Sequence, residues 1–409
     1  MTFSAPAREI LLVVAAFAVL AIPTECPAAE DAPPRARDLG IPFDGIPGHA
    51  NAITDVAGVT VGHVTLVEDL PDNAAIRTGV TAILPRGSNS LTDIVFGAWF
   101  ALNGNGEMTG TAWLDESGYL EGPILLTNTH SVGVVHDAAI EWRVRNGDAD
   151  TSGYWWSLPI VAETWDGQLN DINGFHVSKE HVFQALETAA GGTVAEGSVG
   201  GGTGMICHDF KCGIGTSSRV VGSGEGSHMV GVLVQANYGV RETLRIVGVP
   251  VGEHMPDRQI LNQNGPDSGE AGSIIIVVAT DAPLLPHQLK RLCKRASLGL
   301  ARNGSYAGNG SGDIFICFST RRIDVDSSER SIPVTMMLNR AMDPYFRATV
   351  EATEEAIVNA MIAARDMTGH MGRHVQAIDH KALQEVLARY GRLGPSEHRV
   401  ADDQGIQHD

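Results

Sequence analysis

The chain has 409 residues, of which 43% are apolar, and its formal net charge is -19 at pH 7. This length allows one large domain or two to three ordinary ones, and the apolar fraction is ample for a buried core. The acidic balance, without any run of Lys and Arg, argues against nucleic acid as a partner, because phosphate binding needs a basic surface. The body of the chain also lacks an apolar run long enough for a membrane helix.

Residues 1–29 have the pattern of a secretory signal peptide. A basic start at Arg8 precedes an apolar run over residues 10–22, and a small-residue stretch ends in Ala28-Ala29. The apolar run is too short to span a membrane, and cleavage is expected near Ala28 or Ala29. We therefore expect an exported protein, periplasmic or secreted, that is free of the membrane once the signal is removed. Its Pro- and charge-rich start, residues 30–39, is expected to be an extended and mobile lead-in.

The cysteines do not form a disulfide scaffold. Lipid attachment at Cys26 is disfavoured, because the glutamate before it is not the small residue that such processing needs. Cys207 and Cys212 flank a short turn, where an oxidising compartment allows a disulfide without requiring one. Cys293 and Cys317 are expected to be small core residues of a helix and a strand. Their spacing suits no zinc site, and we expect no metal or other cofactor.

The body alternates between short apolar runs and turns, with amphipathic helical segments between them and no repeat or linker that divides it. Several strands precede Gly272, at least two follow it, and helices lie on either side. This order favours a layered α/β sandwich built from the whole body over two separate domains. Strands are expected over residues 58–66, 78–85, 124–129, 218–221, 229–237, 245–249, 274–280 and 313–320, and helices over 136–146, 179–190, 286–301, from 343 onward and after a cap at 379.

The junction at Gly272-Ser273 is the most informative stretch. A polar segment over residues 255–272 stops there, and an uninterrupted β-branched run begins at the next residue, Ile274. Such a run predicts a strand buried on both faces. Gly272 allows backbone shapes closed to other residues, so Ser273 could attack its own preceding carbonyl and become a new N-terminus. The alternative is that Ser273 simply begins a core strand.

Four further residues could carry chemistry. In the Gly-rich stretch before residue 314, the hydroxyl of Ser311 and the carboxylate of Asp313 could polarise another serine, although this stretch is also a good turn. Glu163 could bind a substrate ammonium group or be a surface carboxylate. Asn237, at the end of an apolar strand, could donate its amide to an oxyanion or only form a turn.

Other motifs are disfavoured. The Gly-rich stretch 197–204 resembles a phosphate cradle but lacks the Lys-Ser/Thr that should follow it. His370 and His374 have the spacing of a helical zinc site, yet Met371 stands where a metalloprotease has its glutamate. No G-x-S-x-G is present, which disfavours a nucleophile elbow.

Taken together, the sequence resembles the DmpA-type family of self-processing serine aminopeptidases, which includes L-aminopeptidase/D-esterase-amidases and β-peptidyl aminopeptidases. The resemblance runs from about residue 51 to residue 366. The residues that carry it are Asn51 to Val59, Thr78 to Thr81, Gly106 to Gly110, Leu126 to Gly133, Gly272-Ser273 with the strand after it, and Gly308 to Phe318.

The resemblance implies a four-layer αββα sandwich like that of the N-terminal nucleophile hydrolases, with different strand connectivity. It implies a precursor that cuts itself before Ser273, giving an α chain (residues 30–272) and a β chain (residues 273–409) of one catalytic domain. Ser273 would be the nucleophile, Ser311 and Asp313 its partners, Asn237 the oxyanion donor, and Glu163 the holder of the substrate amino group. Oligomers of αβ units and independence of metals are implied as well.

One position departs from the family pattern as we expect it. Trp165 stands where a tyrosine would contribute its hydroxyl to the oxyanion site, and indole offers one N–H donor but no hydroxyl. We expect Trp165 to be a wall of an altered or narrower acyl pocket. The substrates expected are small peptides, amides or esters with a small N-terminal residue, whether α-L, D or β. Alternatives are an acyltransferase of ornithine acetyltransferase-like architecture and a catalytically silent periplasmic binding protein.

Overall fold

The structure, a computed structural model, describes residues 33–147, 156–256, 271–323 and 330–394. The predicted signal peptide and the C-terminal tail lie outside these residues. From residue 34 onward the chain forms one compact unit. Its two main sheets have the strand orders β1-β2-β5-β6 and β4-β3-β12-β11-β10-β9. Their strands are β1 Thr60–Asp69, β2 Ala75–Leu84, β5 Ile124–Asn128 and β6 Ile160–Thr164 in the first sheet, and β4 Tyr119–Leu120, β3 Val95–Ala101, β12 Gly310–Ser319, β11 Ala271–Thr280, β10 His228–Asn237 and β9 Ile214–Val221 in the second.

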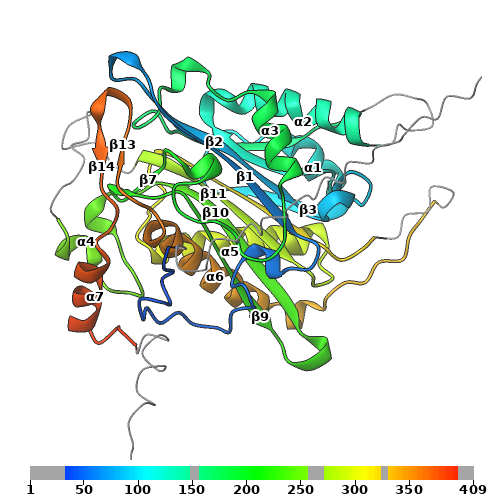
Figure 1. Ribbon diagram of the computed structural model, residues 1–409. Helices are drawn as coiled ribbons and strands as arrows, with labels where there is room; N and C mark the ends of the chain where they lie inside the picture. Colours follow the sequence, from blue (N-terminus) through cyan, green and yellow to red (C-terminus); the bar gives the residue numbers. More distant parts are fainter. Residues whose placement is uncertain (1–32, 148–155, 257–270, 324–329, 395–409) are drawn as a thin grey trace, which may run out of the picture. The chain divides into compact units, whose positions relative to one another are not determined.

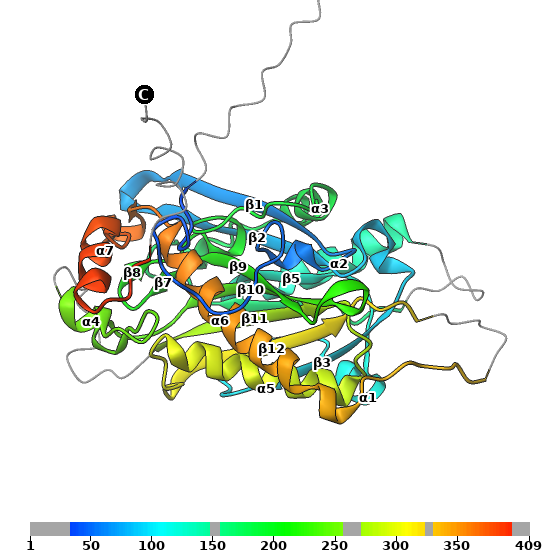
Figure 2. The ribbon, with the colours of Figure 1, turned by 90° about the horizontal axis from the view of Figure 1, so that it is seen from below.

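The helices cover the outer faces of the two sheets, so the order of layers is helix, sheet, sheet, helix (Figures 1 and 2). The predicted αββα sandwich is therefore confirmed. Helices α2 and α3 form one outer layer, and helices α5 and α6 form the other. Strands β7 and β8, and strands β13 and β14, form two separate two-stranded sheets. The remaining elements are α1 Thr111–Ser117, α2 Val132–Asn146, α3 Lys179–Glu187, α4 Val251–His254, α5 Pro286–Arg302, α6 Asp343–Ile362, α7 His380–Arg389, β7 Ile206–Cys207, β8 Phe210–Lys211, β13 Met367–Thr368 and β14 His374–Val375.

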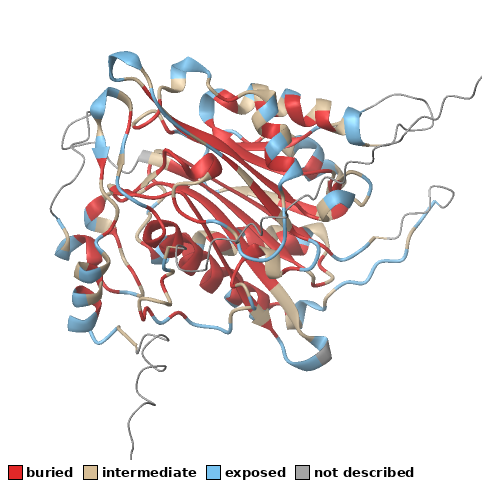
Figure 3. Cartoon of the chain, viewed as in Figure 1, coloured by how far each residue is buried: buried red, intermediate tan, exposed pale blue. Residues whose placement is uncertain are grey.

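The central strand β11 is apolar on both faces because it lies between two cores. Side chains alternate between the faces of a strand, so Ile274 and Ile276 pack toward α5 and α6. Ile275 and Val277 pack between the two sheets. A third core lies between the first sheet and α2 and α3. Buried residues accordingly make up most of the central strands β10, β11 and β12 and most of α6 (Figure 3).

Two expectations about local structure were wrong. Residues 245–249 do not form a strand: Val247 and Gly248 have positive φ angles, and a single bridge joins Ile246 to Val249. The described part of the lead-in is also fixed rather than mobile. Its Arg35 and Arg37 bind the carboxylates of Glu196 and Glu355, far away in sequence, and Ala36 is fully buried.

The sequence suggested one possible disulfide, whereas the structure has a second one as well. The structure joins Cys207 to Cys212, whose Cα atoms are 5.4 Å apart. It also joins Cys293 of α5 to Cys317 of β12, with Cα atoms 5.8 Å apart, whereas the sequence suggested two unpaired core residues. A helix packed on the face of a sheet brings side chains together that are distant in sequence, and the spacing of these two cysteines gives no sign of that contact.

A buried ion pair fastens α6 to the edge strand β9. Arg219 and Glu355 are each 1% exposed and lie 2.7 Å apart, and the guanidinium also donates to the carbonyl of Asp44 at 2.7 Å. Without Arg219, Glu355 keeps its second cation, Arg37, but the carbonyls that the guanidinium binds lose their donor, and a buried acceptor left without a partner costs about 1–3 kcal/mol. We expect Arg219→Met to lower the thermal unfolding midpoint markedly. Lys290→Met is the control, because Lys290 pairs with Asp115 in solvent. Equal midpoints for the two variants would contradict this account of the α6 contact.

Candidate active site

Three neighbouring strands of the second sheet bring the predicted nucleophile and its partners to one end. The antiparallel pairing of β10 with β11 places Asn237 opposite Ser273. The parallel pairing of β11 with β12 places Gly312 beside Ser273, with Ser311 and Asp313 on either side. Ser273 is 5% exposed, so its hydroxyl lies in a largely enclosed site.

The residue before the serine can only be a glycine. Gly272 has a φ of +112°, and a Cβ atom on it would lie 2.1 Å from the carbonyl oxygen of Asn237. Both the positive φ and the close approach exclude a side chain. The peptide bond between Gly272 and Ser273 is thereby pressed against strand β10.

A hydrogen-bonded network surrounds the carboxylate of Asp313. The Ser311 hydroxyl donates to Asp313 Oδ1 at 2.6 Å, and the Asn103 amide donates to Asp313 Oδ2 at 3.0 Å. Asn103 Oδ1 in turn accepts from the backbone N–H of Asp313 at 2.5 Å. The network meets the nucleophile through the backbone, since the N–H of Gly312 donates to Ser273 Oγ at 3.1 Å. The structure therefore brings Ser311 and Asp313 together and places both next to Ser273.

Asn103 was missed in the sequence analysis. It lies just ahead of Gly106, where the family resemblance begins in this part of the chain, within the turn-like run Leu102 to Gly106. An Asn next to a Gly is typical of any turn, so the pattern gives no sign that this amide would bind a carboxylate about two hundred residues later. The Gly312 N–H was missed because a backbone donor has no signature in the sequence.

The side-chain amide of Asn237 is held in one orientation. Its Nδ2 donates to the carbonyl of Trp165 at 2.9 Å, and its Oδ1 accepts from the N–H of Ile206 at 2.9 Å. An amide nitrogen carries two hydrogens, so one of them serves this contact and the other is suited to a substrate oxyanion. The structure thus places Asn237 beside Ser273, and its role as oxyanion donor stays a prediction.

Glu163 is the last residue but one of strand β6 of the other sheet and is 3% exposed. Its Oε1 accepts from the backbone N–H of Glu107 at 3.0 Å, and its Oε2 accepts from the hydroxyl of Thr129. Burial raises the pKa of the Glu163 carboxyl, while the two hydrogen bonds act in the opposite direction. A buried carboxylate with two donors is preorganised to receive a cation such as an ammonium group. The alternative of a surface carboxylate is therefore wrong.

The loop around Gly106 connects the two halves of the site. A Cβ atom on Gly106 would lie 3.2 Å from the Cα of Gly312 and 3.5 Å from Glu163 Oε1. Gly312 in turn is packed so closely on the loop that a Cβ atom there would lie 2.3 Å from the carbonyl oxygen of Asn105. Gly106 therefore lies between the carboxylate of Glu163 and Gly312, whose N–H contacts Ser273 Oγ.

Trp165 takes part in the site through its backbone. Its carbonyl fixes Asn237, while its indole lies against Gly167, and the residue is 44% exposed. The next residue, Asp166, is fully buried, and this burial raises its pKa to about 7. The expected role of the indole as a pocket wall stays a prediction.

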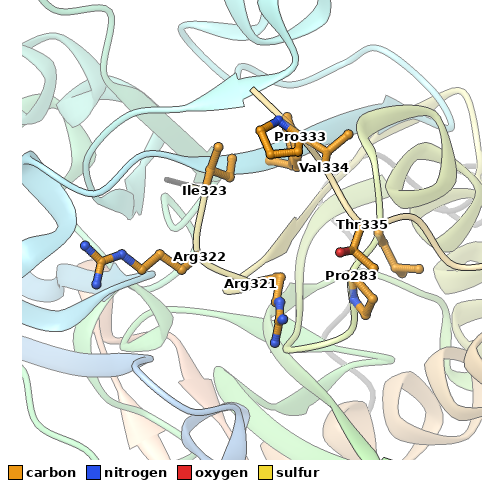
Figure 4. A pocket seen from close by; sticks show the side chains of 9 residues that line it. Pro283, Arg321, Arg322, Ile323, Pro333, Val334 and Thr335 are labelled. Atoms are coloured by element: carbon orange, nitrogen blue, oxygen red, sulfur yellow. The ribbon is translucent and has the colours of Figure 1, made fainter. Parts of the chain in front are cut away.

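A hollow of about 180 Å³ lies at the opposite ends of the same strands (Figure 4). It is lined by residues that follow β11 and β12, among them Pro283 and Arg321. Seven residues of β11 follow Ser273, which is roughly 20 Å of chain. This hollow is therefore not part of the serine site.

The zinc pattern noted in the sequence does not lie on a helix. His370 begins a short 3-10 turn, and His374 begins the short strand β14. Within the described ranges, no group of three or more His, Cys, Asp or Glu side chains could hold a metal ion. The helices described there include none that is long and apolar enough to cross a membrane.

A serine at the start of a central strand in an αββα sandwich is the arrangement of an N-terminal nucleophile hydrolase, and the comparisons identify this chain as a serine aminopeptidase. Its residues 51–375 match peptidase family S58, and the chain belongs to that family. It is 50% identical over 384 residues to the β-peptidyl aminopeptidase BapA of Sphingosinicella microcystinivorans, an alignment that covers 90% of this chain and 96% of that protein.

Solved structures agree with this assignment. The L-aminopeptidase D-Ala-esterase/amidase of Ochrobactrum anthropi, described as a prototype for the serine aminopeptidases and a variant of the Ntn hydrolase fold, is 49% identical with a TM-score of 0.83. It covers 88% of this chain and 100% of its own. A Burkholderia sp. β-aminopeptidase is 47% identical with a TM-score of 0.81, and the match covers 87% and 99% of the two chains.

The Asp313 network generates a prediction. Asn103→Asp keeps the shape of the side chain but faces Asp313 Oδ2 with a second carboxylate oxygen, and like charges disfavour ionisation of the pair. Since loss of an acid–base group typically costs about 10²–10⁴-fold, we expect kcat on an aminoacyl p-nitroanilide to fall at least tenfold. Asn105→Asp is the control: Asn105 lies in the same loop, and its amide donates to the Gly310 carbonyl at 2.9 Å instead. Similar rates for both variants would contradict a role of the Asn103–Asp313 contact in the reaction.

Proposed function

We propose that the chain cuts itself between Gly272 and Ser273 and then releases small N-terminal residues from peptides, amides or esters through an acyl-enzyme on Ser273. The observation that carries the proposal is the place of Ser273: its hydroxyl is held by Gly312, and the peptide bond before it is pressed against Asn237. The proposed products are an α chain over residues 30–272 and a β chain over residues 273–409, which stay together in one sandwich.

Self-cleavage follows from an acyl shift. Ser273 Oγ attacks the carbonyl carbon of Gly272, a C–O bond forms, and the C–N bond to Ser273 breaks as its nitrogen takes up a proton. Water then hydrolyses the resulting ester and leaves a carboxylate on Gly272 and a free amine on Ser273. The β-strand contacts of β11 with β10 and β12 hold the new terminus in place.

The mature site then repeats the attack on a substrate. The ammonium group of the substrate pairs with Glu163, and Ser273 Oγ attacks the carbonyl of the first residue. Asn237 Nδ2 donates to the developing oxyanion, an interaction worth about 2.7–4 kcal/mol when one such donor is removed elsewhere. Two groups can take the serine proton: the Ser273 amine, whose unperturbed pKa is about 7.7–8.0, and the Ser311–Asp313 pair.

The substrate class rests on the relatives. One is named a β-peptidyl aminopeptidase, one a β-aminopeptidase and one an L-aminopeptidase with D-Ala-esterase/amidase activity. A panel of β-homoalanyl, L-alanyl, glycyl and D-alanyl p-nitroanilides separates these preferences. Hydrolysis of the acyl-enzyme by water, rather than transfer to an amine, distinguishes the proposal from the acyltransferase alternative.

Location and assembly complete the proposal. The signal-peptide pattern over residues 1–29 supports export to the periplasm or the medium. Self-association of αβ units is supported by Val334, Met336 and Leu338, which are 48%, 45% and 53% exposed at alternating positions of one extended segment. Large exposed apolar side chains that gather in one place typically mark an interaction surface. The activity proposed needs no cofactor.

Ser273→Ala tests self-cleavage. The wild-type protein should give two bands on a denaturing gel, and the smaller should begin Ser273-Ile274 by N-terminal sequencing. Since the variant lacks the attacking hydroxyl, it should give one band and no activity. Ser297→Ala, on the exposed side of α5, should behave as wild type. An active wild-type enzyme that gives one band of full length on the gel would refute the proposal.

Glu163→Gln tests recognition of the amino group. We expect KM for an aminoacyl p-nitroanilide to rise at least tenfold, because a charged hydrogen bond is replaced by a neutral one. An otherwise identical substrate without the amino group should be affected little. In the wild type, kcat/KM should fall as pH falls through the raised pKa of Glu163, since the protonated carboxyl cannot pair with an ammonium group. That acid limb should vanish in Glu163→Gln, and its persistence would count against the assignment.

A further inference from the structure

We propose that the β7–β8 hairpin positions the oxyanion donor Asn237. The Cys207–Cys212 disulfide closes this hairpin, and hydrogen bonds from the buried Lys211 amine hold it from within. The inference rests on the proposed function, because it assumes that Asn237 acts in the transition state. It adds residues that lie outside the Ser273 and Glu163 contacts already described.

The hairpin contacts the side chain of Asn237 and the backbone of the residue after it. The N–H of Ile206, the first residue of β7, donates to Asn237 Oδ1 at 2.9 Å. The N–H of His208, at the turn, donates to the carbonyl of the next residue, Tyr238, at 2.8 Å. An amide side chain has two ends that differ only in their partners. The Ile206 N–H therefore selects the orientation in which Nδ2 points to the side of Trp165 and the substrate.

The hairpin is too small to hold this geometry by itself. Each strand has two residues, with Ile206 opposite Lys211 and Cys207 opposite Phe210. The turn residues His208 and Asp209 have φ angles of +49° and +60°. Two positive φ angles suit a tight hairpin turn, but they are unfavourable for residues other than glycine. An isolated two-stranded hairpin is at best marginally stable in water, so other contacts must hold this one.

The first fastener is covalent. The Cys207–Cys212 disulfide closes a loop of six residues directly after Ile206, and both cysteines are fully buried. The N–H of Cys212 also donates to the carbonyl of Met205 at 3.0 Å. The disulfide thus joins the two ends of the hairpin next to the N–H that meets Asn237.

The second contact that holds the hairpin is made by a buried amine. The Lys211 amine is fully buried and donates to the carbonyls of Met205 at 2.8 Å and Cys212 at 2.7 Å. Burial also lowers the pKa of Lys211 to about 7. A buried amine is costly unless it is hydrogen-bonded. Its two hydrogen bonds therefore hold the carbonyls of Met205 and Cys212 in place. Met205 precedes Ile206, which makes this contact adjacent to the one with Asn237.

The tip of the hairpin is tied to the loop that follows β10. Arg241 donates to the carbonyls of His208 at 2.7 Å and Asp209 at 2.8 Å, and its guanidinium lies 3.3 Å from the ring centre of Phe210. These contacts fix the outer end, whereas the disulfide and Lys211 fix the end at Asn237. Loss of the inner fasteners should therefore leave the hairpin attached but let Ile206 move.

Movement of Ile206 should affect the rate rather than substrate binding. Glu163, which is proposed to hold the amino group, belongs to the first sheet and is fixed by Thr129 and Glu107. A misplacement of about 1 Å in a reacting group can cost on the order of 10²-fold. We expect Cys207→Ala combined with Cys212→Ala to lower kcat about tenfold or more, with KM within twofold of wild type.

The second disulfide provides a matched control. Cys293→Ala combined with Cys317→Ala removes an equally buried pair that contacts neither Ile206 nor Asn237 in the described contacts. Its kcat and KM should stay within twofold of wild type. Unfolding midpoints of both double variants are measured, so that a general loss of stability is separated from the change in kcat.

Chemical reduction avoids a variant that fails to fold. Mature Cys293→Ala/Cys317→Ala enzyme is treated with a dithiol: the Cys207–Cys212 bond breaks, both sulfurs become thiols, and the dithiol is oxidised to its own cyclic disulfide. Alkylation and intact mass identify the reduced fraction. That fraction should lose kcat, and reoxidation before alkylation should restore it. Lys211→Met, which removes the other fastener, should lower kcat in the same way.

The outcomes separate the two proposals. Wild-type enzyme that neither cleaves itself nor hydrolyses aminoacyl p-nitroanilides refutes the proposed function. An active wild type whose Cys207/Cys212 variant, or reduced form where that variant does not fold, keeps its kcat refutes the positioning role alone. A rise in KM without a fall in kcat refutes it as well, because that result would place the hairpin in substrate binding.

Discussion

The register of strand β11 with its two neighbours is the constraint on which the site depends. Alternation of polar and apolar side chains usually fixes register, because a one-residue slip turns every side chain to the other face. That signal is weak here, since β11 is apolar on both faces. Close packing replaces it: Gly272 lies against the Asn237 carbonyl and Gly312 against the Asn105 carbonyl. Two glycines at the strand ends thus align the hydroxyl, the amide and the carboxylate network.

Folding and catalysis both require that the polar side chains of the site have fixed hydrogen-bond partners. Asp313 and Ser311 are fully buried, and Glu163 is nearly so. A buried polar group without a partner costs about 1–3 kcal/mol, more when it is charged. Each of these groups therefore has fixed hydrogen-bond partners that stabilise the folded chain. The same partners hold the groups in place before substrate arrives, which is the preorganisation that electrostatic catalysis requires.

The sequence pattern could place the main residues of this arrangement at strand ends, whereas the family resemblance, not that pattern, predicted that they form one site. The β-branched run after Ser273 marked the central strand, and Asn237 and Asp313 ended or began apolar runs. Contacts between distant segments could not be predicted. The binding of Asn103 to Asp313 and of Arg35 to Glu196 depends on how the layers pack. Residues 245–249 misled because their apolar pattern suits a strand, whereas the backbone reverses at Val247 and Gly248.

The two sheets divide the work of the site. The second sheet supplies the hydroxyl, the amide and the carboxylate network, and the first supplies Glu163 at the end of β6. The loop around Gly106 is the contact between them, since it lies against Gly312 on one side and Glu163 on the other. If Glu163 holds the substrate ammonium group as proposed, its distance to Ser273 is set by the packing of two separate sheets. A substrate with one more backbone carbon, such as a β-amino acid, would have a longer separation between its ammonium group and its carbonyl, and the packing of the two sheets, rather than the strand register at Ser273, would have to match it.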